Sequence, residues 1–220
     1  GRVLGAGGRS AGGAGLDTFR QSTRRMSEFD YREIKLSGRY VFLRPPRRGD
    51  FKAWSALRIA DRHHVEPWEP AWPEFANSRR DWRGRYHSWR SSWQRGTGAT
   101  FFVFENTSSS FAGSAGLTGI KGGAANSAML GYWLGKSYVG KGFMTEAVNL
   151  VADWAFSSLG LSRIEAGTLP ENEKSQRVLE RCHFQREGVA REYLEIAGKR
   201  RDHVLYAKLA SDPAGDSKPE

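Results

Sequence analysis

Two periodicities of hydrophobic and polar residues alternate along the chain. Apolar side chains spaced three and four apart are typical of a helix, whereas short apolar and aromatic runs between turn residues are typical of strands. The helical spacing predicts helices over residues 50–62, 78–96, 141–159 and 172–184. The shorter runs predict strands over residues 39–46, 99–106, 110–120, 127–135 and 162–170, and two more over 188–210 that turn at Ala197–Gly198.

The order of these elements predicts the architecture. One strand and two helices precede three strands, and a helix, a strand, a helix and two strands follow. This order is typical of a single α/β (α+β) domain in which helices flank a mixed, mostly antiparallel central sheet. Asp50 is expected to cap the first helix, and the proline-rich residues 63–75 are expected to form an ordered loop.

The two ends of the chain differ in composition from its middle. Residues 1–25 are rich in Gly, Ala and Arg, show no periodicity, and lack the apolar core of a signal peptide. We expect them to be a disordered or non-native extension, with Met26 as the alternative start of translation. Residues 26–210 are expected to form the folded domain, and residues 211–220 a polar tail.

The composition limits the class of protein. The chain has 220 residues, enough for one domain with a sizeable core, and no run of 18 apolar residues that would span a membrane. Its single cysteine, Cys182, excludes an intramolecular disulfide and a cysteine-based zinc site, and it suits the reducing cytoplasm. Because Cys182 lies on the apolar face of its expected helix, a buried thiol is favoured over a nucleophile.

The net charge of the chain is +10, of which +4 belongs to residues 1–25, with five Arg and one Asp. A basic chain can bind nucleic acid, the ribosome or an anionic cofactor, and it can equally be basic by chance. The second expected helix is rich in arginine, at Arg79, Arg80, Arg83, Arg85, Arg90 and Arg95. Contact between this basic surface and ribosomal RNA is therefore one hypothesis.

Two further groups of side chains favour structural roles. His63 and His64 are adjacent, not four residues apart as in a helical metal site, so surface positions are expected and no metal site is predicted. Aromatic residues recur at helical spacing in the second helix, at Trp82, Tyr86, Trp89 and Trp93. This spacing favours packing in the core over a platform for stacking bases.

Gly140 and Gly142 lie at the start of the helix expected over residues 141–159. Glycines at this place let an anion approach the free N–H groups of a helix N-terminus, where the helix dipole favours negative charge. The GxxxxGK[ST] pattern of a P-loop is absent, and Thr145 replaces the third glycine of a dinucleotide-binding fingerprint. The two glycines alone predict either a phosphate cradle or a tight strand-to-helix turn.

The surrounding segments resemble the GCN5-related N-acetyltransferases (GNAT). The resemblance rests on GYWLGKSYVGKGFMTEAVNLVADWAF, RIEAGTLPENEKSQRVLERCHF and REYLEIAGKRRDHVLYAKL, and it covers about residues 39–209. PWEP at 67–70 and RDHVLYA at 201–207 resemble the ribosomal-protein alanine N-acetyltransferase (RimJ/RimL-like) group in particular. The resemblance implies a single GNAT-type domain that uses acetyl-CoA as its co-substrate.

The same resemblance implies where the pyrophosphate of acetyl-CoA binds. The family's [RQ]-x-x-G-x-[GA] loop is similar to residues 137–142, although Ser137 departs from the pattern at the first position. Lys141 either adds positive charge or faces solvent. The pyrophosphate is expected on the N–H groups of Val139, Gly140, Lys141, Gly142, Phe143 and Met144.

The motif PENEKS is the second part of the resemblance. It implies that Asn172 and Ser175 contact the pantetheine arm and the thiol region of acetyl-CoA. Both residues also fit an ordinary helix start, with Asn172 as the N-cap. His183 stands where the family often has a glycine after this helix, which is expected to shift the local turn.

Acetyl transfer to an amine requires an acceptor for the amine proton, a donor to the oxyanion, and stabilisation of the departing thiolate. An N-terminal α-amine has a pKa of about 7.7–8.0 and needs only a modest base. The resemblance implies that Glu192 is this base, and a salt bridge to Arg200 or Arg201 is its structural alternative. Glu69 in PWEP is the second candidate base.

Three further groups complete the expected site. Ser175, or Tyr193 as second choice, is expected to protonate the thiolate. A backbone N–H near Leu134 is expected to donate to the oxyanion. Asp202 and His203 are expected either to line the acceptor site or to form a structural hydrogen-bond pair.

The sequence therefore predicts an N-acetyltransferase that acts on the N-terminal α-amine (Ala or Ser) of a ribosomal protein by direct attack on acetyl-CoA. Polyamines or antibiotics are alternative acceptors, although the only obvious acidic cluster is Glu66, Glu69 and Glu74. A non-catalytic ribosome- or RNA-binding module on the same fold is a further alternative. A monomer or homodimer in the cytoplasm is expected.

Overall fold

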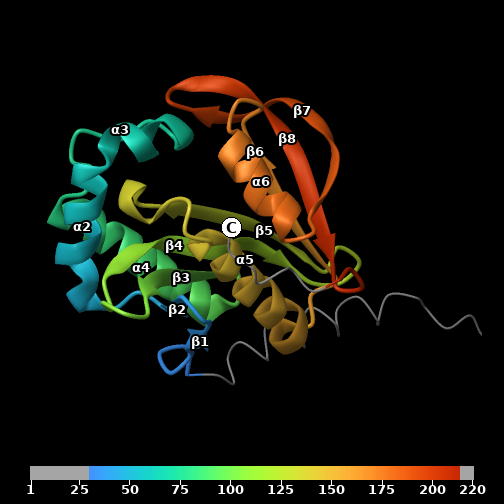
Figure 1. Cartoon of the computed structure of the whole chain (residues 1–220), viewed down its shortest axis with the longest axis horizontal. Coiled ribbons are helices and arrows are strands. Elements are labelled where there is room, and N and C mark those ends of the chain that lie inside the picture. The colour runs from blue at the N-terminus through green and yellow to red at the C-terminus, as the bar shows by residue number, and fades with distance from the viewer. Residues whose placement is uncertain (1–29, 214–220) are drawn as a thin grey trace, which may run out of the picture.

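Eight strands form one sheet with helices on both of its faces (Figure 1) in the computed structural model, which describes residues 30–213. The expected extension over residues 1–25 and most of the expected tail, residues 214–220, lie outside the described residues. The strands are β1 (Leu36–Ser37), β2 (Val41–Arg44), β3 (Gly98–Glu105), β4 (Phe111–Lys121), β5 (Ser127–Leu134), β6 (Arg163–Thr168), β7 (Gln185–Ile196) and β8 (Lys199–Leu209). The helices are η1 (Arg48–Asp50), α2 (Phe51–Ala60), α3 (Arg62–Val65), η2 (Glu66–Trp68), α4 (Arg79–Arg95), η3 (Lys136–Tyr138), α5 (Phe143–Trp154), the π-helical turn η4 (Ala155–Leu159) and α6 (Glu173–Arg181).

The sheet is mixed and mostly antiparallel, as the sequence predicts. Its strand order is β1-β2-β3-β4-β5-β6-β8-β7, and among the described strands the only parallel neighbours are β5 and β6. These two strands pair from Ser127–Arg163 to Leu130–Ala166, yet β5 continues to Leu134. The carboxyl-terminal half of β5 therefore has a backbone edge without a strand partner on its β6 side.

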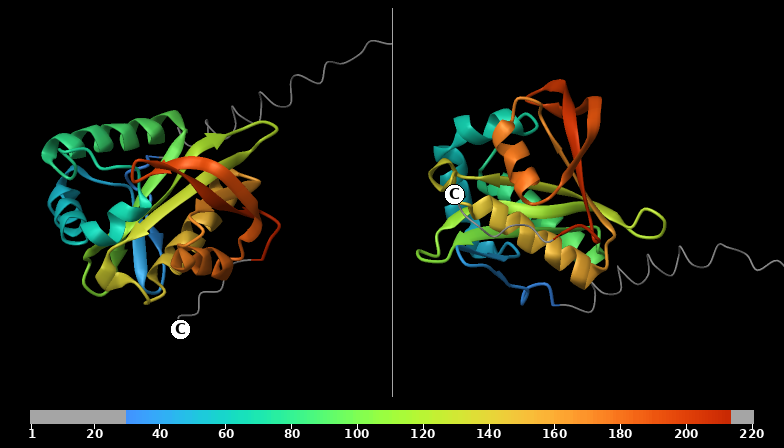
Figure 2. Two further views of the ribbon diagram at one scale, coloured as in Figure 1. Left: turned by 90° about the horizontal axis from the view of Figure 1, so that it is seen from above. Right: turned by 45° about the vertical axis from the view of Figure 1, so that its right-hand side comes forward.

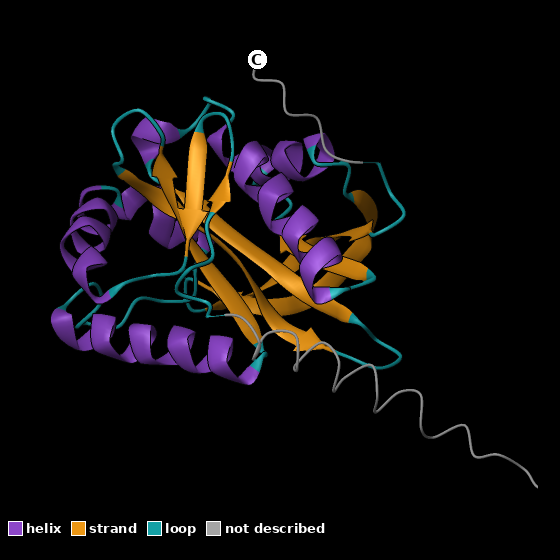
Figure 3. Cartoon of the chain, turned by 90° about the horizontal axis from the view of Figure 1, so that it is seen from below, coloured by secondary structure: helices purple, strands orange, loops and turns teal. Residues whose placement is uncertain are grey.

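Helices lie on both faces of the sheet (Figures 2 and 3), and the cores beneath them differ in size. The α5 and α6 side holds the larger core, in which Val148 of α5 and Ile164 of β6 are fully buried. The α2 and α4 side holds an aromatic cluster built on Trp54, Trp82 and Phe102. The alternation of side chains along each strand supplies both cores, because successive residues of a strand point to opposite faces.

Local sequence signals explain the long helix α4. Ser78 accepts a hydrogen bond from an N–H of the first turn, and Gly96 ends the helix with a left-handed φ of 67°. Trp82 and Trp93 of the aromatic stripe are buried, and its other two members pack partly buried against the aromatic cluster. The prediction that this stripe belongs to the core is confirmed.

Three local expectations were wrong. The sequence missed the two-residue strand β1, and the loop expected over residues 63–75 begins with the short helices α3 and η2. Pro67 is compatible with η2 because it lies in the first turn, where its missing N–H is not needed. Asp50 stands before α2, but its carboxylate binds the guanidinium of Arg44 at 2.7 and 2.8 Å and the N–H of Arg47 at 2.7 Å instead of capping α2.

The β7–β8 hairpin turns at Ala197 and Gly198, as predicted, with φ values of 49° and 79°. Its tip reaches the side of the molecule where α3 lies (Figure 1). There the N–H of Ala197 donates to the carbonyl oxygen of Glu69 at 3.0 Å. The PWEP segment and the hairpin tip, far apart in the sequence, are thus joined by a backbone hydrogen bond.

Candidate active site

The glycine turn leads from η3 into α5. Gly140 and Gly142 both adopt left-handed φ values, 80° and 74°, and Gly142 is the N-cap residue of α5. A Cβ atom added at Gly140 would meet no protein atom within 4 Å, so the space in front of the turn is open. The first N–H groups of α5 lack intrahelical acceptors, and the dipole favours an anion there. This geometry fits the pyrophosphate of acetyl-CoA.

The unpaired edge of β5 leads directly to this turn. The N–H of Gly135 donates to the carbonyl of Ala112 on the β4 side at 2.8 Å. Successive N–H groups of a strand point to opposite edges, so the N–H of Leu134 points to the β6 side, where β5 has no strand partner. This direction agrees with the role expected for Leu134 as an oxyanion donor.

Neighbouring residues fix the turn in place. Asp61, at the end of α2, accepts a hydrogen bond from the N–H of Lys136 at 2.7 Å. A Cβ at Gly135 would lie 2.8 Å from a methyl group of Leu57, so a larger residue there would require Leu57 to shift. The ammonium group of Lys141 lies 5.6 Å from the ring centre of Tyr138, beside the turn.

A buried carboxylate in the first turns of α5 was missed by sequence reasoning. Glu146 is only 8% exposed and accepts hydrogen bonds from the N–H groups of Arg39, Tyr40 and Val41 at 2.6, 2.8 and 2.9 Å. A Cβ at Gly38 would lie 2.4 Å from the carboxyl carbon of Glu146. Glu146 therefore ties the turn between β1 and β2 to the helix that carries the glycine cradle.

The second motif opens α6. The side chain of Asn172 accepts a hydrogen bond from the N–H of Ser175 at 3.1 Å, which confirms Asn172 as the N-cap. The hydroxyl of Ser175 lies 2.8 Å from that of Tyr132 on the free half of β5. Sequence reasoning missed Tyr132, although its alternation with Leu130 and Leu134 along the strand places all three on the face covered by α5.

Glu192 lies on an irregular part of β7. The pairing of β7 with β8 shifts between Ala190 and Leu194, and Glu192 adopts a left-handed φ of 48°. Its N–H donates to the carboxylate of Asp202 at 2.8 Å, and its side chain is exposed. Strained, bulged residues of this kind recur at functional sites.

The salt bridge considered for Glu192 has no support in the described contacts of the two arginines. Arg200 donates instead to the backbone carbonyls of Glu192 and Tyr193, at 3.4 and 3.1 Å. Arg201 forms an ion pair with Glu171. The exposed carboxylate of Glu192 thus keeps the candidate role of base.

Tyr193 and His203 pack together above β6. Their ring centres are 5.6 Å apart, and atoms of both rings lie within 3.7 Å of the place a Cβ would take at Gly167. His203 is buried, and its Nδ1 lies 3.0 Å from the carbonyl oxygen of Arg201, which can only accept. Asp202 and His203 therefore bond separate backbone groups and not each other.

Glu69 is held within a cluster around Arg58. The guanidinium of Arg58, in a side chain only 2% exposed, binds both oxygens of Glu69 at 3.0 and 2.6 Å. Glu69 also accepts a hydrogen bond from the indole N–H of Trp72 at 2.7 Å. Arg58 further donates to Asn77 at 2.8 Å and lies 5.2 Å from the ring centre of Trp133 on β5. Three donors, two from Arg58 and one from Trp72, thus hold the carboxylate of Glu69 in place.

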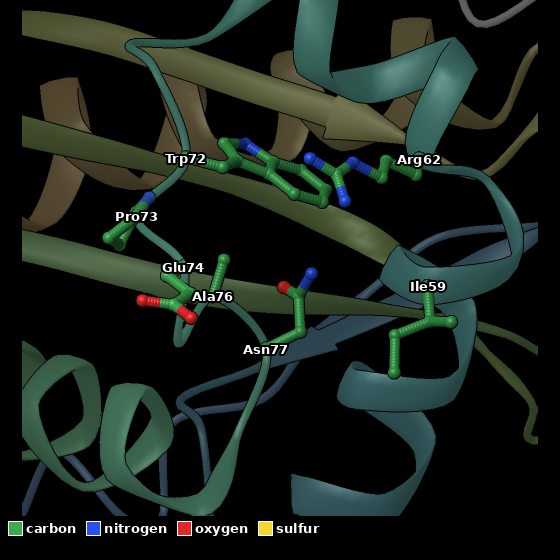
Figure 4. Close-up of a pocket in the computed structure, with 7 residues that line it drawn as sticks. All are labelled: Ile59, Arg62, Trp72, Pro73, Glu74, Ala76 and Asn77. Atoms are coloured by element: carbon green, nitrogen blue, oxygen red, sulfur yellow. The ribbon is translucent and has the colours of Figure 1, made fainter.

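A pocket of about 370 Å³ lies beside this cluster (Figure 4). Trp72 and Asn77 belong both to the pocket wall and to the Arg58 cluster. No residue of the glycine turn lines it, so it is separate from the expected acetyl-CoA site. The lining residues are Ile59, Arg62, Trp72, Pro73, Glu74, Ala76 and Asn77.

The end of α6 confirms the structural role expected for Cys182. The thiol is fully buried, and this burial raises its pKa to about 12, which leaves it un-ionised at neutral pH. The buried ammonium group of Lys208 donates to the carbonyl of Cys182 at 2.6 Å. His183 adopts a left-handed φ of 60°, the conformation for which glycine is common after a helix, so the substitution leaves the turn itself in place.

Several arginines of α4 have partners within the chain. Arg79 and Arg80 lie 4.7 Å from the ring centres of Phe51 and Phe75, and Arg85 pairs with Asp81 at 2.9 Å. Guanidinium groups engaged in this way contribute to the packing of α4. The arginine content of this helix is therefore weak evidence for a site that binds RNA.

Two other kinds of feature are absent from residues 30–213. Within residues 30–213, no group of three or more His, Cys, Asp or Glu is arranged to hold a metal ion. No helix in the same part of the chain is long and apolar enough to cross a membrane. His63 and His64 lie on α3.

The free edge of β5 and the glycine turn at the start of α5 together form a site suited to an extended ligand with an anionic group. Comparisons with known proteins agree. The family model for the acetyltransferase (GNAT) domain matches residues 41–185. The chain belongs to the GNAT acetyltransferase family, and it is an acyltransferase that uses acetyl-CoA.

Two curated relatives match most of the chain. The chain is 34% identical to the probable N-acetyltransferase YjcK of Bacillus subtilis, over 80% of this chain and 98% of that protein. It is 32% identical to the [ribosomal protein uS5]-alanine N-acetyltransferase of Escherichia coli, over 74% of this chain and 85% of that protein. These matches confirm the RimJ/RimL-like group within the family.

Two solved structures are also similar to this chain. Mycobacterium smegmatis RimJ in complex with CoA-disulfide superposes with a TM-score of 0.76 at 35% identity, covering 80% of this chain and 85% of that one. The ribosomal-protein-S5-alanine acetyltransferase of Vibrio fischeri also gives a TM-score of 0.76, at 29% identity, over 82% and 98% of the two chains. The predicted fold class is confirmed.

Proposed function

We propose that this acetyltransferase modifies the N-terminal α-amine of a ribosomal protein that begins with Ala or Ser, in the cytoplasm. The observation that carries the proposal is the similarity to the uS5-alanine N-acetyltransferase of Escherichia coli, which extends over 85% of that protein. The structural match to a RimJ with bound CoA-disulfide supports the same assignment. A protein N-terminus also matches the chemistry of the site, because its amine needs only a modest base.

The proposed mechanism uses groups on four elements, β5, α5, α6 and β7. The cradle at Gly140 and Gly142 holds the pyrophosphate of acetyl-CoA and fixes the direction from which its thioester approaches β5. The N–H of Leu134 donates to the carbonyl oxygen of the acetyl group as negative charge develops there. The carboxylate of Glu192 takes the amine proton, and Ser175 stabilises the departing thiolate.

The acceptor is tested by thiol release from acetyl-CoA with three amines. These are a peptide that begins with Ala, the same peptide with a blocked N-terminus and a free lysine, and spermidine. Release with the free Ala terminus alone is expected. Release with spermidine alone would instead identify a small-amine acetyltransferase. Binding of acetyl-CoA without release from any of the three would contradict the proposal for isolated N-termini and require an assay with intact ribosomal proteins.

Replacing Glu192 with glutamine should lower kcat by about a hundredfold, the usual contribution of a positioned base. The affinity for acetyl-CoA, measured by calorimetry, should not change, because β7 lies away from the glycine cradle in the sheet order. Glu195→Gln is the matched control, since Glu195 is also exposed on β7. If Glu192→Gln keeps the full rate between about pH 6 and 9, Glu192 is not the base.

A further inference from the structure

The hydroxyl groups of Tyr132 and Ser175 form a pair beside the free half of β5. Their oxygen atoms are 2.8 Å apart, and the Tyr132 hydroxyl also donates to the carbonyl oxygen of Ser175 at 3.1 Å. Tyr132 comes from β5, and Ser175 comes from the first turn of α6. The N–H of Ser175 donates to the side chain of the N-cap residue Asn172, which fixes the backbone of Ser175 at the start of α6. Both hydroxyls thus lie on rigid elements next to the expected thiol region.

The two hydroxyls have two ways to share their hydrogens. A carbonyl oxygen only accepts, whereas each hydroxyl donates one hydrogen and accepts others. When Tyr132 donates to the Ser175 carbonyl, the Ser175 hydroxyl can donate to Tyr132. When Tyr132 turns its hydrogen to Ser175 Oγ, the Ser175 hydrogen is released to point elsewhere. Both arrangements use the same oxygen positions, so the exchange requires only rotation of two O–H bonds.

We propose that Tyr132 is a positioning residue that turns the hydroxyl of Ser175 toward the sulfur of coenzyme A when the thiolate leaves. The inference rests on the proposed role of Ser175 and extends it to a residue of β5. In the resting enzyme the serine hydrogen is directed to Tyr132. As negative charge appears on sulfur, the Ser175 hydroxyl turns its hydrogen toward the sulfur. The Tyr132 hydroxyl then turns its own hydrogen toward Ser175 Oγ and donates a hydrogen bond to it.

This step needs no proton transfer from either residue. The carbon–sulfur bond breaks with its electron pair on sulfur, and the thiolate is stabilised by the hydrogen bond from Ser175 until water protonates it. The amine proton goes to the base on β7. Burial raises the pKa of Tyr132, so its hydroxyl keeps its hydrogen throughout the neutral range. A hydroxyl that donates while it also accepts is a stronger donor, because linked hydrogen bonds polarise one another.

The direct test is the ionisation of the thiol of coenzyme A bound to the enzyme, followed by the ultraviolet absorbance of the thiolate against free enzyme. Tyr132→Phe should lower the ionisation constant of the bound thiol about tenfold, because Phe cannot donate the hydrogen bond to Ser175 Oγ that directs the serine hydrogen to the thiolate. Ser175→Ala should lower it at least as much. The double variant should match Ser175→Ala alone, because Tyr132 acts through the serine.

Tyr206→Phe is the matched control. Tyr206 reaches the same helix from β8, where its hydroxyl lies 3.3 Å from Gln176 and 3.2 Å from Glu180. This variant should lose a comparable contact with α6 and leave the thiol titration at its wild-type value. Melting temperatures of both tyrosine variants, measured with coenzyme A, separate loss of stability from loss of positioning.

Two titration results would overturn the inference: an ionisation constant that is unchanged or raised in Tyr132→Phe, or one that is lowered equally in Tyr206→Phe. The titration uses coenzyme A alone and needs no acceptor, so its result is independent of the proposed acceptor. Turnover gives the second readout, because kcat should fall about tenfold in Tyr132→Phe with unchanged KM for acetyl-CoA. A further fall when Tyr132→Phe is added to Ser175→Ala would also contradict a role through the serine.

Discussion

Replacing Gly142 with glutamate should weaken acetyl-CoA binding by about a hundredfold or more, equivalent to about 2.7 kcal/mol. The glycine adopts a φ of 74° at the N-cap of α5, a conformation that strains any other side chain except Asn or Asp. The new carboxylate would also lie where the helix N-terminus is proposed to hold the pyrophosphate, so it would repel the ligand. Isothermal titration calorimetry with acetyl-CoA measures the loss.

Gly119→Glu provides the matched control for this experiment. Gly119 also has a left-handed φ, 58°, and open space around it, but it lies in β4 near the hairpin that enters β5, at the other end of that strand from the glycine turn. It should share the backbone strain and the added charge while leaving acetyl-CoA affinity intact. Equal affinity in the wild type and Gly142→Glu would refute the cradle.

Replacing Glu146 with alanine should lower the free energy of unfolding by about 3 kcal/mol, since three backbone N–H groups would lose their acceptor in a buried place. In a domain of this size this corresponds to a fall in melting temperature of about 8 °C. The three hydrogen bonds join residues 105 to 107 positions apart, so their loss also frees the β1–β2 turn from α5. Thermal and urea unfolding measure the change.

Glu173→Ala is the control for Glu146→Ala. Glu173 also lies near the start of a helix, but its side chain is 75% exposed and its pair with Arg177 is a surface i,i+4 contact. Removing it should change stability by no more than about 0.5 kcal/mol. A similar small effect in Glu146→Ala would mean that water replaces the carboxylate on the three N–H groups, and that Glu146 is not a structural anchor.

The sequence predicted the elements whose signals are local. The helical spacing of α4, with Ser78 and Gly96 at its ends, and the Ala197–Gly198 turn need only neighbouring residues to specify them. The strand β1 was missed because two residues carry no periodicity, and it exists only through its pairing with β2. Asp50 was assigned to the wrong partner because a cap position does not exclude a stronger interaction with a nearby arginine.

The candidate site also combines residues that local motifs predict with residues that depend on distant contacts. Gly140, Gly142 and Asn172 were predicted from short motifs, and the structure gives them the backbone geometry those motifs require. Tyr132, Arg58 and the anchoring role of Glu146 depend on contacts between distant segments. A single sequence carries no local signal for such contacts, because nothing near Tyr132 indicates that its hydroxyl meets the first turn of α6.

The hydrogen bond between Ala197 and Glu69 has a consequence for the exchange of segments between related enzymes. It unites the hairpin tip with a loop whose carboxylate is fixed by Arg58. A chimaera that takes only the PWEP loop, or only the hairpin, from another member of the family would place a foreign segment against a native one at this contact. The two segments therefore form one exchangeable unit and should be transplanted together.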